Sequence, residues 1–283
     1  MKKSITRINS SESLSLRNYK RLNSIFDQKH WNISDNPNGI YYRYCRTLLK
    51  MTPKEQSLFL NMTERFQDFK MQDCISGFVS VIKDVFSDYE GYTIYCFRCV
   101  NENDQGKTKS SSSLLYLLKE PEIKDIQPSS IKLSVIDDPS SLKGLKLAKK
   151  SLFLLIDDFV GTGETVREAL EYILKSSGKS QEGLEIAIAS VVMMKQGYDF
   201  VRRLGIKPFH KVKLKRGISD YFKGDGLKAA LGTIDSIESK IKGLNDEFRH
   251  GYHQSEALVK LTRCPNNTFP VYWLPSKDAP YAR

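Results

Sequence analysis

The chain has 283 residues, 40% of them hydrophobic, which is enough for one well-filled core and a small second domain. No stretch approaches the roughly 20 apolar residues of a membrane span, and the N-terminal residues lack the apolar centre of a secretory signal. Together with an odd number of cysteines, five, this predicts a cytoplasmic protein with reduced thiols and no membrane partner.

Residues 1–90 show the spacing of helices. Thr52 and Glu55 flank Pro53 in the pattern of a capping box, which predicts a helix that begins there. Apolar residues recur at helical spacing in the two segments that follow, 58–69 and 75–86. We expect a helical N-terminal extension over residues 1–90, with these stripes facing its core.

From residue 92 the apolar period changes and strands alternate with helices. The expected strands are 93–100, 131–136, 152–156, 184–194 and 210–214, and the expected helices begin at 114 and span 165–175. Such alternation is typical of a parallel α/β sheet flanked by helices. Further on, we expect a helix over 233–249 and a small β element made of strands 258–262 and 269–274. The predicted domains are therefore 1–90 and 91–283.

Two clusters of residues could suggest a zinc site, but each has a simpler interpretation. Cys96 and Cys99 form a CxxC pattern inside an expected strand, and no second such pair follows. His250 and His253 stand three apart in a polar segment, as exposed histidines commonly do. Buried strand cysteines and exposed histidines are the interpretation we favour.

The segment 151–175 carries the strongest functional signal. A run of apolar residues, 152–156, predicts a strand buried on both faces, and Asp157 and Asp158 stop it at its carboxyl end, where α/β sheets place their ligands. A short Gly/Thr loop then opens an amphipathic helix. Backbone N–H groups at such a helix start can cradle a phosphate, and carboxylates accept hydrogen bonds from vicinal hydroxyls. This combination suits a sugar phosphate.

At these residues the chain resembles the phosphoribosyltransferase family. The family signature has four apolar residues, two acids, two apolar residues, a small residue and Thr-Gly-x-Thr, here FLLI-DD-FV-G-TGET. The resemblance implies a type I phosphoribosyltransferase-like sheet, in which Asp157 and Asp158 are catalytic, meet the ribose hydroxyls of phosphoribosyl pyrophosphate and hold Mg²⁺ through water. The implied phosphate-binding residues are Gly161, Thr162, Gly163, Glu164 and Thr165. Many relatives have a small residue in place of Glu164, and an acid suits a phosphate site only if its side chain turns to solvent or to a cation.

The polar loop 101–113 follows the first expected strand and has two interpretations. As in the family, it could bind pyrophosphate through Lys107, Lys109, Ser110 and Ser111. Alternatively, NENDQGKT at 101–108 nearly matches the P-loop pattern GxxxxGK[ST] of a degenerate nucleoside triphosphatase. Asn101 then occupies the place of the first glycine, and the loop at 161–165 is left unexplained.

The tail 251–275 looks like that of phosphoribosyltransferase-like proteins from bacterial conflict and antiphage operons. It contains Gly-Tyr-x-x-Ser-Glu-Ala-Leu at 251–258 and Pro-Asn-Asn-Thr-x-Pro at 265–270. Some of these relatives are encoded beside retron reverse transcriptases. The resemblance therefore implies a reverse transcriptase–DNA complex or another defence-operon protein as partner. The net charge of +11 favours contact with nucleic acid.

Two classes of function follow from these observations. The first is an antiphage effector enzyme, a glycosyltransferase that binds phosphoribosyl pyrophosphate or a related nucleotide with Mg²⁺ and acts on a phosphoribosyl or N-glycosidic bond. The second is a module without turnover that senses a nucleotide and binds nucleic acid or protein within a defence complex. Release of pyrophosphate or of a free base distinguishes the two.

Overall fold

The computed structural model describes residues 14–102, 110–274 and 279–282. They form two compact units, which are treated separately below: residues 69–215, the sheet unit, and residues up to 68 together with those from 216 onward, the helical unit. The two units are groups of residues in contact and do not test the expected domains, 1–90 and 91–283, which stay a prediction. Within the described ranges, no helix has the length and apolar character needed to cross a bilayer.

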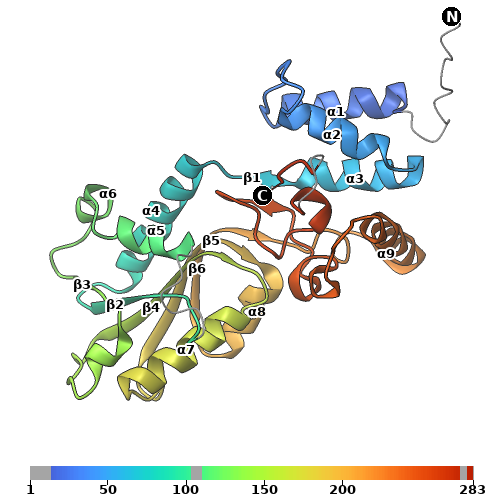
Figure 1. Cartoon of the computed structure of the whole chain (residues 1–283). Coiled ribbons are helices and arrows are strands. Elements are labelled where there is room, and N and C mark those ends of the chain that lie inside the picture. Colours follow the sequence, from blue (N-terminus) through green and yellow to red (C-terminus); the bar gives the residue numbers. More distant parts are fainter. Residues whose placement is uncertain (1–13, 103–109, 275–278, 283) are drawn as a thin grey trace, which may run out of the picture. The chain divides into compact units, whose positions relative to one another are not determined.

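The sheet unit is built on five parallel strands in the order β3-β2-β4-β5-β6 (Figure 1). Their bounds are β2 Thr93–Arg98, β3 Lys132–Val135, β4 Ser151–Val160, β5 Glu185–Met194 and β6 Lys207–Leu214. The two long strands β4 and β5 are buried along most of their length, as expected for the centre of a parallel sheet. The α/β class with a parallel sheet flanked by helices is therefore confirmed.

Helices cover both faces of this sheet (Figure 1). They are α4 Met71–Asp88, α5 Ser110–Leu117, α6 Pro121–Lys124, α7 Glu164–Ser177 and α8 Lys195–Arg203. Helix α4 packs on β5 and β6, and α5 on β2 and β4. Under α7 and α8, fully buried side chains such as Phe153, Leu155 and Ile188 form one core with apolar residues of the two helices. Successive side chains of β4 point to opposite faces of the sheet, so its apolar residues contribute to the packing on both faces.

Strand β4 is longer than the apolar run that predicts it. We expected the strand to stop at Asp157, but it continues to Val160. The reason is its neighbour: β5 is ten residues long and stays paired with β4 as far as Val160 and Met193. Two polar residues are tolerated inside the strand because the neighbour on the other side, β2, has already ended at Arg98.

The helical unit is held by an aromatic core. Its elements are α1 Leu16–Gln28, α2 Ile40–Leu49, α3 Pro53–Arg65, β1 Gln67–Asp68, α9 Gly224–Ser239, β7 Val259–Lys260, and 3-10 turns at Asp246–Phe248, Tyr252–Gln254 and Pro270–Tyr272. Tyr272 stacks on Phe59 at 5.1 Å between ring centroids and lies 4.5 Å from Phe66. The capping box of Thr52 and Glu55 at the start of α3 is confirmed.

Two expectations for residues 233–274 are wrong. The helix expected over 233–249 begins earlier, at Gly224, and ends at Ser239, because Ile234 and Ile237 bury its apolar face despite the glycines at its start. The strand expected over 269–274 is instead a 3-10 turn that begins at Pro270. Proline lacks the N–H that a strand ladder needs, and the turn buries the Tyr272 ring in the aromatic core.

A carboxyl group is buried between α9 and the loop that follows it. The Glu238 side chain has no exposed surface and accepts the backbone N–H of His250 at 3.0 and 3.2 Å. Burial raises the pKa of Glu238 to about 8, and nearby Asp235 adds to the effect, while the His250 N–H and Arg249 act in the opposite direction. The Glu238 carboxyl of the folded protein therefore stays mostly protonated at neutral pH.

Glu238 predicts how stability depends on pH. The unfolded carboxyl loses its proton near pH 4.5, and the folded one near pH 8, so between these values the unfolded state binds fewer protons. The free energy of unfolding should then fall as pH rises from about 4.5 to about 8. We expect Glu238→Gln to remove this decline in urea denaturation at pH 5 and pH 8.5. The exposed Glu247→Gln is the control, and an unchanged decline in the Glu238 variant would contradict the assignment.

Candidate functional site

Asp157 and Asp158 lie where the sheet opens. They sit in β4 directly after Ile156, the last residue that pairs with Arg98 of β2. Both carboxylates are half-buried, and the Asp158 N–H donates to Asp157 Oδ1 at 2.9 Å. Because β4 continues beside β5 while β2 has ended, the two acids stand at the carboxyl edge of the sheet, beyond the last residue of β4 that pairs with β2. This is the edge where parallel α/β sheets bind ligands.

The loop after β4 places the start of α7 beside these acids. Gly163 precedes the helix with φ 92°, a left-handed conformation that favours glycine. The first turn of α7 therefore presents backbone N–H groups that have no acceptor inside the helix. Thr162 Oγ1 accepts the Glu164 N–H at 3.4 Å, and the Thr165 side chain is exposed. The residues predicted to bind phosphate thus form one short loop, which we call the cradle, residues 161–165.

Helix α8 packs directly against the cradle, and this contact explains one glycine of the cradle, Gly163, and one of α8, Gly197. A Cβ atom on Gly163 would lie 2.6 Å from the Phe200 ring. A Cβ on Gly197, at the start of α8, would collide with the carbonyl oxygen of Gly161. The backbone of the cradle is therefore fixed by close approach to α8, and only glycine fits at these contacts.

Glu164 is turned toward a cation. Its carboxylate accepts from the Arg167 guanidinium at 2.7 Å, one turn further along α7, and Arg167 also pairs with Glu171 at 3.2 Å. These acids raise the pKa of Arg167 above its ordinary value, with Glu164 contributing most. An acid suits a phosphate site if its side chain faces a cation. Glu164 meets this condition, because its carboxylate faces Arg167.

Arg98, which ends β2 opposite Ile156 and so next to the acids, is a candidate that could not be recognised from the motifs. Its guanidinium donates to Ser112 Oγ at 3.2 Å and lines a cavity of about 240 Å³ together with Tyr116, Lys119 and Asp137. Arg98 is the single charged residue in the otherwise uncharged strand TIYCFR. A charge at the carboxyl end of a predicted strand is the signal that could have identified it.

The structure bears only in part on the loop 101–113. Lys107 and Lys109 lie outside the described residues, and Ser110 and Ser111 begin α5. At the start of the loop, Asn101 Nδ2 donates to the Glu168 carboxylate of α7 at 3.0 Å. The loop therefore leaves the sheet next to α7, the helix that follows the cradle.

The remaining candidates lie apart from the cradle residues in the chain. Cys96 is in β2 and Cys99 follows it, both buried, and burial raises the pKa of the Cys96 thiol. His250 and His253 belong to the helical unit, where His250 Nε2 lies 2.8 Å from Asp235 Oδ1. Among the described residues, no three or more His, Cys, Asp or Glu side chains gather as a metal cluster.

Gly163 yields a stability prediction. Gly163→Ala places a methyl group against Phe200 at a left-handed φ, so we expect it to lower the free energy of unfolding by about 1–3 kcal/mol. The matched control is Gly178→Ala, also at a left-handed φ of 64°, where the nearest atom to a Cβ is Lys143 Cγ at 3.9 Å. The difference between the two in urea denaturation isolates the close approach of α8, and equal losses would contradict it.

The chain is similar in part to several solved structures. Hypoxanthine phosphoribosyltransferase from Staphylococcus aureus is 14% identical over 52% of this chain and 75% of its own, with a TM-score of 0.29. AQ2163 from Aquifex aeolicus is 14% identical over 65% and 87%, with a TM-score of 0.32. A hypothetical protein from Neisseria gonorrhoeae with bound ppGpp is 10% identical over 53% and 85%, with a TM-score of 0.29. No curated protein matches the chain.

The comparison with protein families gives a match that spans most of the chain. The model of the PRTase-CE family matches residues 55–282, which include the whole sheet unit and the segment after it. The match contains Asp157, Asp158 and the cradle. The chain therefore belongs to the PRTase-CE family of phosphoribosyltransferase-like proteins.

Proposed function

We propose that the chain binds phosphoribosyl pyrophosphate, or a related nucleotide, at Asp157, Asp158 and the cradle and acts on a phosphoribosyl or N-glycosidic bond. The observation that carries the proposal is the geometry of β4 and α7. Two half-buried carboxylates stand at the carboxyl edge of the sheet, in the strand that leads through the cradle into the first turn of α7. Neutral donors and a helix dipole suit a phosphate, and carboxylates suit ribose hydroxyls.

In this proposal the protein contributes mainly position and charge. The cradle holds the 5′-phosphate through residues 161–165, and Asp157 and Asp158 accept the ribose hydroxyls. The bond from the anomeric carbon to pyrophosphate, or to a base, breaks and a bond to the acceptor forms, with positive charge developing on the ribose ring between. Orientation of the sugar and fixed carboxylates near that charge lower the barrier.

The residues present fit Mg²⁺. This ion is commonly held by one or two carboxylates together with waters and substrate phosphates, rather than by a cage of protein side chains. Asp157 and Asp158 are such a pair, and their partial exposure leaves room for water. The ion would neutralise the departing pyrophosphate. Lys107 and Lys109 remain our proposal for the pyrophosphate loop, and Arg98 adds a cation at the same end of β2.

The role in antiphage defence, and a retron reverse transcriptase–DNA complex or defence-operon protein as partner, are supported by the resemblance of the 251–275 tail. Contact with nucleic acid is supported by exposed basic residues along α8 and β6, including Arg202, Arg203 and Lys213. Next to them, Tyr198 has the Lys213 ammonium 4.1 Å from its ring centre. Cations and aromatic rings together are common in nucleic-acid contacts.

A thermal-shift titration with phosphoribosyl pyrophosphate and Mg²⁺ tests the binding. Ligand at about 100 times its dissociation constant should stabilise the folded chain by roughly 2.7 kcal/mol. We expect Asp157→Asn/Asp158→Asn to lose this shift. The matched control is Asp84→Asn/Asp125→Asn, two exposed acids of the same unit outside the cradle, which should keep it. A shift that survives in the cradle variant would place the ligand elsewhere, and no shift in the wild type would contradict the proposal.

A second candidate, a nucleotide sensor without turnover, is favoured by one observation. The Glu164 carboxylate stands at the first position of α7, where a bound phosphate would meet a negative charge beside it. Its pairing with Arg167 reduces this repulsion without removing it. Release of pyrophosphate in the presence of an acceptor indicates the enzyme, and binding with no product over hours indicates the sensor.

Glu164 yields a prediction that serves both candidates. Glu164→Gln removes the charge beside the phosphate site and frees Arg167 from its nearest acid, so affinity for inorganic phosphate, the group that the cradle is proposed to hold, should rise about threefold to tenfold, equivalent to about 0.6–1.4 kcal/mol. Calorimetric titration measures it. Glu171→Gln is the control, because it loses the other partner of Arg167 one turn further from the cradle and should change affinity little. Unchanged or weaker binding by Glu164→Gln would show that the acid does not oppose the anion.

A further inference from the structure

Helix α8 and the neighbouring strand β6 carry an excess of positive charge. Between residues 195 and 215 the sequence has seven Lys or Arg residues and one acid, Asp199. Strand β6 is one edge of the sheet, and α8 packs against it. Arg202 and Arg203 in the last turn of α8 and Lys213 in β6 are exposed. We call these three cations, together with Tyr198 of α8, the basic surface.

The acids beside these elements are paired with other cations. Asp199 lies 2.6 Å from the Lys195 ammonium, and this contact is the main cause of a lowered pKa of the Asp199 carboxyl. Asp88 of α4 pairs with Lys207 of β6 at 2.9 Å. With respect to the described residues, none of the three cations of the basic surface forms an ion pair. Their charges are therefore not neutralised by these acids.

Aromatic rings hold the cations of the basic surface in place. The Lys213 ammonium lies 4.1 Å from the centre of the Tyr198 ring, and the Arg202 guanidinium lies 5.8 Å from the same centre. The Arg203 guanidinium lies 6.0 Å from the centre of the Phe200 ring. A ring attracts a cation through its quadrupole and has no net charge. The three side chains are therefore positioned before a ligand arrives, and their charge is kept.

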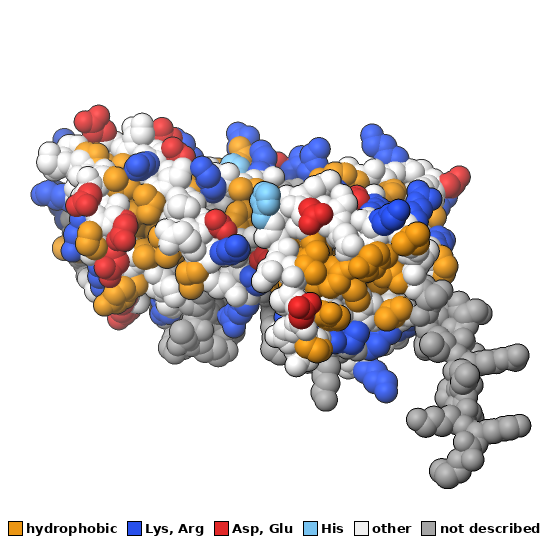
Figure 2. Space-filling view, turned by 90° about the horizontal axis from the view of Figure 1, so that it is seen from above, with side chains coloured by type: hydrophobic (Ala, Val, Ile, Leu, Met, Phe, Trp, Pro, Cys, Tyr) orange, Lys and Arg blue, Asp and Glu red, His pale blue; other side chains and the backbone are white. Residues whose placement is uncertain are grey.

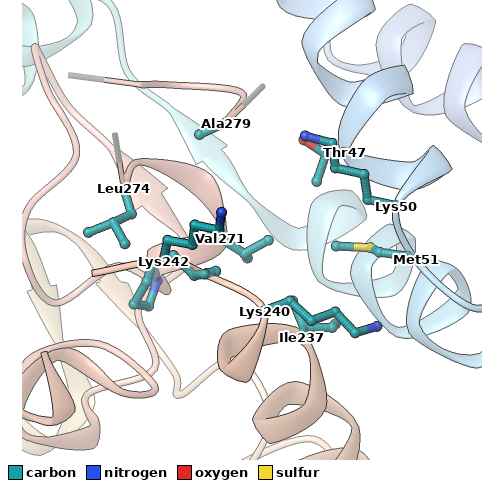
Figure 3. A pocket seen from close by; sticks show the side chains of 11 residues that line it. Thr47, Lys50, Met51, Ile237, Lys240, Lys242, Val271, Leu274 and Ala279 are labelled. Atoms are coloured by element: carbon teal, nitrogen blue, oxygen red, sulfur yellow. The ribbon is translucent and has the colours of Figure 1, made fainter. Parts of the chain in front are cut away.

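Lys240 of the helical unit shows the opposite arrangement. It lines a cavity of about 370 Å³ together with Met51 and Val271 (Figure 3). Both carboxylate oxygens of the buried Glu55 lie 2.6 Å from its ammonium. An acid at this distance cancels most of the field that the lysine would exert on an anion. Cations that are held by neutral rings exert that field in full.

His210 shows that the field around Lys213 is positive. The His210 ring lies 5.3 Å from the Tyr198 ring between centres. Burial lowers the pKa of His210, and the Lys213 ammonium lowers it further. Both effects disfavour a second positive charge at this point. The histidine is therefore neutral at pH 7, and Lys213 supplies the charge beside Tyr198.

The basic surface lacks the exposed apolar side chains of a protein interface. None of the residues of α8 and β6, all of which the structure describes, is an exposed large hydrophobic residue. Other parts of the chain do expose such residues. Hydrophobic side chains gather on one part of the face in Figure 2, and Leu16, Ile33 and Leu49 of the helical unit are exposed. Because protein interfaces commonly have an apolar centre, the composition of the basic surface favours a polyanion instead.

We propose that the basic surface binds the phosphate backbone of a nucleic-acid duplex, with Arg202, Arg203 and Lys213 on the phosphates. This proposal rests on the nucleic-acid contact proposed above and specifies which component of the nucleic acid is contacted. Contact through cations favours a duplex over a single strand, because a duplex carries roughly one negative charge per 1.7 Å of its axis. Phosphate contacts carry no sequence information, so binding should be independent of sequence.

Fluorescence anisotropy of the full-length chain with a labelled DNA duplex tests the proposal. Three phosphate contacts give log affinity against log salt a slope of about −2.7 or steeper, so affinity should fall about fortyfold or more between 50 and 200 mM salt. A duplex of unrelated sequence should bind equally. Tighter binding of either single strand would overturn the proposal in favour of base stacking, and a slope near zero would overturn phosphate contact. Neither phosphoribosyl pyrophosphate nor Mg²⁺ is present, so failure of the cradle would leave the result unchanged.

Matched variants locate the bound duplex. Arg202→Gln/Lys213→Gln removes two phosphate contacts and should make the slope shallower by about 1.8. Lys124→Gln/Lys132→Gln removes the same charge from exposed lysines of α6 and β3, and β3 is the opposite edge of the sheet, so the slope should stay as in the wild type. Equal changes in the two variants would show that only net charge matters and would overturn the assignment. Urea denaturation confirms that each variant is folded.

Tyr198 separates a ring that holds cations from a surface of mobile charges. Tyr198→Phe keeps the ring and should bind the duplex as the wild type does. Tyr198→Leu removes the ring and should weaken binding about twofold to fivefold, because Lys213 and Arg202 are then no longer positioned. Equal binding by the two variants would contradict this role of the ring. Displacement of the labelled duplex by poly-glutamate more readily than by unlabelled duplex would overturn the proposal in favour of an acidic protein.

Discussion

The unequal length of the two neighbours of β4 is the constraint on which the candidate site depends. On one side β5 pairs with β4 as far as Val160. On the other side the pairing of β4 with β2 ends at Ile156, which lies opposite Arg98. The segment between these points is held in a strand by β5 alone, beyond the end of its pairing with β2. Asp157 and Asp158 occupy it, so the sheet fixes their backbone while their carboxylates stay partly exposed. For the ribose site that we propose here, such a fixed backbone would hold the two carboxylates in position for the sugar.

The cradle depends on a second constraint, the packing of α8 across it. Gly197 comes close to the Gly161 carbonyl, and Phe200 leaves no room for a side chain on Gly163. The turn is thus shaped by close contacts with the backbone and the Phe200 ring of α8, and Thr162 Oγ1 accepts the N–H of Glu164 at the start of α7. Because α8 also carries Arg202 and Arg203, the helix that shapes the cradle is part of the basic surface of the same unit.

The sequence predicts those parts of the structure that are encoded locally. An uninterrupted apolar run, glycines in a short loop and a helical period place β4, the cradle and α7 in the correct order. The end of β4 could not be predicted, because it is set by the length of β5. The segment 269–274 was misread because its aromatic residues look like a strand, whereas contacts of Tyr272 with Phe59 and Phe66, more than 200 residues away in the chain, favour a turn. Arg98 was missed because the apolar strand around it dominates the pattern.

The helical and sheet units hold their charged groups in different settings. At the cradle the donors are neutral backbone groups at a helix end, and the one nearby acid, Glu164, is held by Arg167. In the helical unit, the Lys240 ammonium is met by the buried carboxylate of Glu55, whose two oxygens each lie 2.6 Å from it. Backbone donors at close range favour a phosphate whatever the rest of the ligand carries.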